Sequence, residues 1–73
     1  MTNAKLKTRI LRATDPDTPY AEIASGVSAK TAARIEKHAA QLGYRVYFRP
    51  ARHSGFTDVE VLWRNGRAVR VDA

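Results

Sequence analysis

Four positively charged residues lie close together near the start of the 73-residue chain, with no acidic residue among them. They are Lys5, Lys7, Arg9 and Arg12. Ammonium and guanidinium groups form charge-assisted hydrogen bonds with carboxylates and phosphates. A helix with these residues on its exposed side would suit an acidic protein partner, and the same pattern is also typical of a helix face that is only solvated.

A second basic row, formed by Lys30, Arg34 and Lys37, repeats at intervals of four and three residues. This spacing places the three side chains on one face of a helix. Such a row suits the phosphates of a nucleic acid, and a solvated face is again the alternative. The second half of the chain adds three arginines to the expected partner-binding set: Arg45, Arg49 and Arg52.

Groups suited to catalysis or metal binding are sparse. The two histidines, His38 and His53, are isolated in the sequence, and the chain has no cysteine and no glycine-rich phosphate loop. An acid–base pair would have to use carboxylates beside a proline turn or near lysines and arginines: Asp15, Asp17, Glu22 or Glu36. We therefore expect no enzyme activity, no cofactor and no metal.

The overall composition is basic, with 13 lysines and arginines against 7 aspartates and glutamates, a net charge of +6, and 44% hydrophobic residues. It predicts one small domain over residues 1–73. No apolar stretch is long enough to span a membrane, and the polar start MTNAKLKTR lacks the apolar segment of a secretory signal. We expect a cytoplasmic protein without a membrane partner, attracted to polyanions and acidic protein surfaces.

The apolar periodicity of the first 42 residues is helical. Thr18 and Pro19 are suited to start a second helix, and Gly26 to end it, because proline is tolerated in the first turn and glycine at the C-terminus. Ser28 is suited to cap a third helix that stops at Gly43. The predicted helices span residues 3–13, 19–25 and 29–42.

From residue 44 the apolar period changes to two, which is typical of strands. The predicted strands span residues 44–49, 57–63 and 67–72. A two-residue turn at Asn65 and Gly66 would place valines on both faces of the last hairpin. A three-residue loop that also includes Arg64 would pair Val61 with Val69 and bury one face, so we prefer this register.

These elements predict an α+β fold, a winged-helix-like domain in which three helices precede a short three-stranded antiparallel sheet. The expected core draws on all of them: Leu6, Ile10, Ile23, Val27, Ile35, Leu42, Val46, Phe48 and Val61.

The segment AEIASGVSAKTAARIEKHAAQLGYRVYF resembles the winged helix–turn–helix family of DNA-binding domains, with Gly26, Val27 and Ser28 similar to its turn. The family usually has three residues between the alanine and the turn glycine, whereas here Ser25 alone separates them. The resemblance implies a DNA-binding repressor whose reading positions are Ala29, Lys30, Thr31 and Arg34. Two of these are small, which favours phosphate contacts over base contacts.

Three segments, MTNAKLKTRILR, DTPYAEIASGVSAKT and VLWRNGRAVRVDA, also resemble the small transcription regulators made by lytic phages of Xanthomonas. This resemblance implies binding to the RNA polymerase of the bacterial host, loss of sigma factor and read-through of intrinsic terminators. It places the protein in the cytoplasm of the infected cell. A polymerase-binding regulator is our leading hypothesis, the DNA-binding repressor is the alternative, and an RNA-binding or structural phage protein is a third class.

Overall fold

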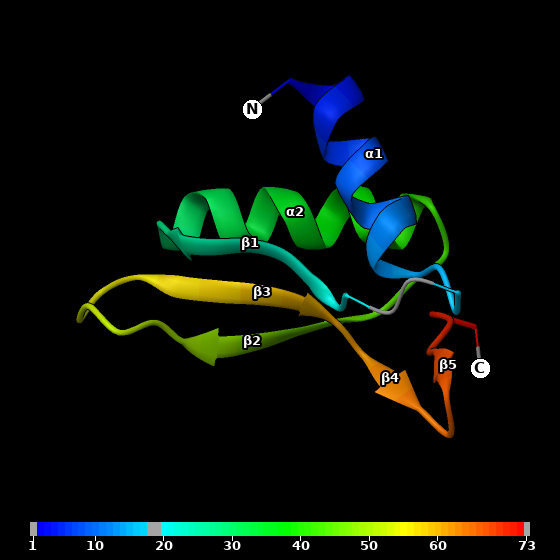
Figure 1. Ribbon diagram of the computed structural model, residues 1–73. Helices are drawn as coiled ribbons and strands as arrows, with labels where there is room; N and C mark the ends of the chain where they lie inside the picture. Colours follow the sequence, from blue (N-terminus) through cyan, green and yellow to red (C-terminus); the bar gives the residue numbers. More distant parts are fainter. Residues whose placement is uncertain (1, 18–19, 73) are drawn as a thin grey trace.

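The computed structural model describes residues 2–17 and 20–72 (Figure 1). Within them the chain forms α1 (Asn3–Ala13), β1 (Glu22–Val27), α2 (Ala29–Gln41), β2 (Val46–Pro50), β3 (Thr57–Val61), β4 (Trp63–Arg64) and β5 (Arg67–Ala68). An antiparallel three-stranded sheet has the order β1-β3-β2, and β4 and β5 form a separate two-stranded ribbon. The structure is therefore a small α+β domain in which β3 is the central strand.

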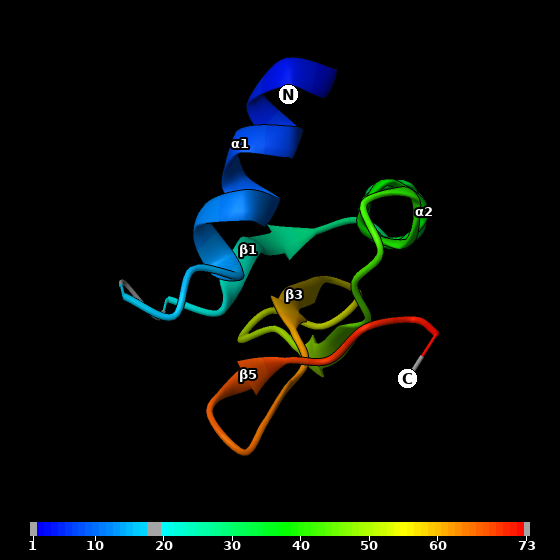
Figure 2. The same ribbon diagram turned by 90° about the vertical axis from the view of Figure 1, so that its right-hand side faces the viewer.

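The two helices pack around the sheet from different directions. Figure 2 looks along the axis of α2, which lies to one side of β1, with α1 above β1. Both helices and the central strand supply the most deeply buried large side chains: Leu6, Ile10, Ile35 and Val59. The core thus lies where α1, α2 and β3 meet.

Helix α1 occupies the residues over which the apolar stripe predicts a helix. Thr2 caps it, because its hydroxyl accepts a hydrogen bond from the backbone N–H of Lys5 at 3.2 Å. Leu6, Ile10 and Ala13 are buried along one side. Every lysine and arginine of this helix is consequently left on its exposed sides.

Helix α2 begins after Ser28, as the cap predicts. The Ser28 hydroxyl accepts a hydrogen bond from the backbone N–H of Thr31 at 3.2 Å. The helix ends before Leu42, and Gly43 follows with a φ of 93°, a conformation that favours glycine. Its buried stripe consists of Ala32, Ile35 and Ala39.

The prediction of three helices followed by a sheet is wrong, because the expected helix over 19–25 is replaced by strand β1. The start of that expected helix, at Thr18 and Pro19, lies outside the described residues. A helix of only two turns has little stability of its own, because the free energy cost of nucleating it is not recovered over so few hydrogen bonds. As a strand, the segment pairs with an edge of β3 that would otherwise lack backbone partners.

The pairing of β1 with β3 is irregular, with bulges on both sides of Ala24. Ile23 and Ala24, although adjacent, are consequently both buried. Near the end of the strand Gly26 has a φ of 63°, and its N–H donates to the Asp58 carboxylate at 2.7 Å. Gly26, expected in the turn of a helix–turn–helix, lies within β1, and the helix expected before it is absent from the described residues. The helix–turn–helix interpretation is therefore wrong.

The preferred register of the last hairpin is also wrong. Arg64 pairs with Arg67 and Trp63 with Ala68, which leaves a two-residue turn at Asn65 and Gly66. Both turn residues have positive φ, 54° and 75°, as a type I′ turn requires. This turn matches the twist of the strands, and it outweighs the expected benefit of collecting the valines on one face.

The last two predicted strands also differ from the observed ones. The strand expected over 57–63 divides into β3 and β4, and the one expected over 67–72 is paired as β5 only at 67–68. Beyond β5, the Arg45 N–H donates to the Val69 carbonyl at 2.9 Å and the Val71 N–H to the Gly43 carbonyl at 3.1 Å. The last residues therefore return along the segment that leads into β2.

The observed core includes most of the predicted residues. Val27, Leu42 and Val46 are half-buried against it, whereas Phe48 is 41% exposed, so its placement in the core is wrong. Phe48 lies on edge strand β2, while the buried residues of the sheet belong to β1 and β3. No helix in residues 2–17 or 20–72 is long and apolar enough to cross a membrane.

We predict that Ile35→Ala lowers the free energy of unfolding by about 2–5 kcal/mol, because Ile35 is 1% exposed and its truncation leaves a cavity. Phe48→Ala should cost much less, since its ring is partly in solvent. Thermal melts followed by circular dichroism compare the two variants. Equal melting temperatures for both would contradict the position of α2 over the sheet.

Candidate partner-binding surfaces

The four basic residues of α1 are divided between two sides of the helix. Lys5, Arg9 and Arg12, spaced by four and three residues, line one shallow hollow of about 330 Å³ on the exposed side. Lys7 lines a different hollow, next to His38 and α2. All four side chains are exposed. The surface that α1 presents to a partner is thus the row Lys5, Arg9 and Arg12, here called the α1 row.

The α1 row continues into a second hollow, of about 290 Å³, between α1 and the start of β1. Arg9 and Arg12 form its basic wall, and Tyr20 and Glu22 lie opposite. The Arg9 guanidinium donates to the backbone carbonyl of Ile23 at 3.4 Å, which ties it to β1. Tyr20, 63% exposed, is a candidate contact that the sequence did not indicate, because Tyr20 falls within the helix expected over 19–25.

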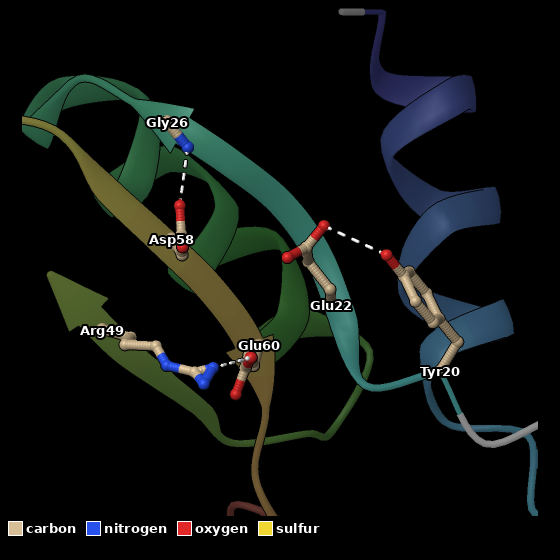
Figure 3. Close-up of polar contacts among 6 residues, drawn as sticks. All are labelled: Tyr20, Glu22, Gly26, Arg49, Asp58 and Glu60. Atoms are coloured by element: carbon tan, nitrogen blue, oxygen red, sulfur yellow. Dashed lines mark hydrogen bonds and ion pairs between the residues drawn. The ribbon is translucent and has the colours of Figure 1, made fainter. Parts of the chain in front are cut away.

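Carboxylates gather on the face of the sheet away from α2, where Figure 3 shows Glu22, Asp58 and Glu60. Glu22 and Glu60 are directly paired across β1 and β3. Like charges in this position destabilise a sheet. Each carboxylate has its own donor, since the Tyr20 hydroxyl donates to Glu22 at 3.3 Å and the Arg49 guanidinium to Glu60 at 3.0 Å.

The remaining arginines of the expected partner-binding set do not join the α1 row. Arg49 is engaged with Glu60, and the Arg45 guanidinium donates to the Val71 carbonyl at 3.1 Å. Arg52 is exposed in the loop between β2 and β3, at the opposite end of the sheet from α1 (Figure 1). The predicted set is therefore spread over separate surfaces.

The second basic row, expected to bind nucleic acid, is exposed along α2. Lys30, Arg34 and Lys37 share the outward side of the helix, as their spacing predicts. The Arg34 guanidinium donates to the Asn3 side-chain carbonyl at 2.6 Å, which links this row to the start of α1. In the described residues strand β1, and not a helix, directly precedes α2, so the helix–turn–helix motif that would present α2 to a major groove is not formed.

Acidic residues and histidines are scattered over the described part of the chain. Among residues 2–17 and 20–72, no three histidine, aspartate or glutamate side chains are grouped so that they could hold a metal ion. The carboxylates that could have formed an acid–base pair do not converge on one hollow. Glu22 lines the hollow beside α1, whereas Glu36 lines a different hollow together with Lys37 and Tyr44.

Comparison with protein-family models, curated proteins and solved structures finds no match. The likeness to phage transcription regulators therefore stays a hypothesis that rests on the three segments quoted above.

We predict that Arg49→Ala lowers the free energy of unfolding by up to about 1 kcal/mol, because it leaves Glu60 opposite Glu22 without its donor. Arg52→Ala removes the same charge from an exposed loop and should change stability by less than about 0.5 kcal/mol. Chemical denaturation at low and high salt measures both, and the cost of Arg49→Ala should shrink as salt screens the carboxylates. Equal stability of the two variants would show that the ion pair contributes nothing.

Proposed function

We propose that this chain is a non-enzymatic transcription regulator of the phage type that binds bacterial RNA polymerase through the α1 row. The observation that carries the proposal is the row itself: Lys5, Arg9 and Arg12 lie exposed along one side of a helix whose other side is buried in the core. The sequence resemblance supplies the identity of the partner.

The charge distribution supports an acidic partner for α1. The chain has a net charge of +6 and residues 3–13 contain no acidic residue, so every charged side chain of α1 is positive. Glu22 of β1 lines the adjoining hollow opposite Arg9 and Arg12, where it accepts a hydrogen bond from Tyr20. Surfaces of a single sign steer encounters with surfaces of opposite sign and reject partners of like sign.

The α1 row is also preorganised for binding. Thr2 caps the helix, Leu6 and Ile10 fix it in the core, and the Ile23 carbonyl holds the Arg9 guanidinium. Binding therefore orders fewer side chains than it would on a mobile segment, and less of the interaction energy is lost to conformational entropy. The neighbouring hollow gives one partner side chain a place between Arg12 and Tyr20.

The mechanism that follows is occlusion without covalent chemistry. By the resemblance, the bound protein displaces sigma factor, which stops initiation by the host, and lets polymerase pass intrinsic terminators. A domain of 73 residues acts in this way by occupying a surface that other factors need. The site of action is the cytoplasm of the infected bacterium.

We predict that the double variant Lys5→Glu/Arg12→Glu loses most of its affinity for purified core RNA polymerase, because the α1 row then repels an acidic surface. The measurement is biolayer interferometry at two salt concentrations, together with assays of sigma-dependent initiation and terminator read-through. Both effects on transcription should disappear with binding. Arg9 is left unchanged because it is tied to β1.

The matched control is Lys30→Glu/Lys37→Glu on α2, which changes the net charge equally, from +6 to +2 (6 − 4). It should keep its affinity. Circular dichroism melts of both variants should stay close to that of the parent, since all four side chains are exposed. Undiminished binding by the α1 variant, or equal loss in both variants, would refute α1 as the polymerase-binding surface.

A further inference from the structure

A hollow of about 520 Å³ lies between the link that follows α1 and the β4–β5 hairpin, and the proposed function does not use it. Its wall combines the aromatic rings of Tyr44 and Trp63 with the guanidinium groups of Arg67 and Arg70. Pro16 closes one side. The volume falls within the range of small-molecule sites, roughly 300–1,000 Å³.

The Trp63 ring is held in place by a hydrogen bond between elements far apart in the sequence. Its indole N–H donates to the backbone carbonyl of Ala13, the last residue of α1, at 3.1 Å. The side chain is half-buried against the core and also lines the hollow. An aromatic surface in a fixed orientation loses little entropy when a planar ligand stacks on it.

Arg70 is held as well. Its guanidinium carbon lies 4.5 Å from the centre of the Tyr44 ring, a cation–π arrangement. Gly43 provides the space, because a Cβ at that position would come within 2.5 Å of an Arg70 nitrogen. A charged planar group is thus fixed in the wall of the hollow. Arg67, by contrast, is exposed at the hairpin and available at the rim.

The charged residues that line the hollow, Arg67 and Arg70, are both positive. Asp15 and Asp17 flank Pro16 in the link after α1, but neither of them lines the hollow. An acidic peptide would use the guanidinium groups and leave the Trp63 ring without a stacking partner. A nucleotide uses both kinds of group, because its base stacks on aromatic and guanidinium planes while its phosphate binds arginine.

We propose that this hollow binds one unpaired nucleotide of a single-stranded nucleic acid, with the base against Trp63 and Arg70 and the phosphate on Arg67. A paired base is already stacked within its duplex and offers no free face to these groups. The nucleotide hollow uses none of the residues of the α1 row, so it does not depend on polymerase binding. RNA and DNA share the required chemistry.

Trp63 is the single tryptophan of the chain, so its fluorescence reports directly on the nucleotide hollow. Titration of the protein with eight-nucleotide single strands of RNA and of DNA should quench this emission in a saturable manner. The comparison of the two strands shows whether the 2′-hydroxyl is recognised. A duplex of the same sequence should bind without comparable quenching.

The decisive variant is Arg67→Ala, which should weaken single-strand binding by about fivefold. The slope of log affinity against log salt concentration should become shallower by roughly 0.7, the value for one phosphate contact on a single strand. Arg52→Ala is the matched control, because it removes an equal charge from an exposed loop at the other end of the sheet. It should bind as the parent does. The proposal is overturned if no strand quenches Trp63, if both variants lose affinity equally, or if a polyglutamate peptide quenches and competes as well as the strands do.

Discussion

The pairing of β1 with β3 determines where the other parts of the domain lie. It makes β3 the central strand, so that Val59 is covered from both sides and is fully buried. It also places β1 beneath α1, where Ile23 meets the apolar stripe of the helix and its carbonyl holds Arg9. The direction of the α1 row is therefore a consequence of strand pairing, and so is the acidic character of the face away from α2.

The two helices follow from local interactions and could be predicted, whereas strand β1 depends on distant residues and could not. Both helices are encoded within their own segments, by the caps Thr2 and Ser28 and by apolar stripes of helical period. The segment of β1 carries an equally helical pattern, and only an available edge of β3, more than thirty residues later, favours its extended form. In the hairpin, the backbone preference of Asn65 and Gly66 outweighed the pattern of the valines.

Part of each candidate surface could also be predicted from the sequence, and part could not. Spacing alone groups Lys5, Arg9 and Arg12 on one side of a helix, and it groups the basic residues of α2 as well. No sequence pattern could show that Arg49 pairs with one of two carboxylates brought together by the β1–β3 register, or that Trp63 and Arg70 line the same hollow. These contacts bring together residues that are far apart in the sequence, and they form only when the chain folds.

The position of β3 in the chain has a consequence for synthesis. The strand that organises the sheet spans Thr57–Val61 of 73 residues, and the hydrogen bond from Trp63 to Ala13 closes the domain over a separation of fifty residues. During translation α1 and α2 emerge before the surface that buries them exists. The core therefore closes in a single late step, governed by long-range contacts that slow folding. Until then the apolar stripes of both helices lack the central strand that covers them, and a chain that terminates before residue 57 lacks the buried side chains of Val59 and Val61.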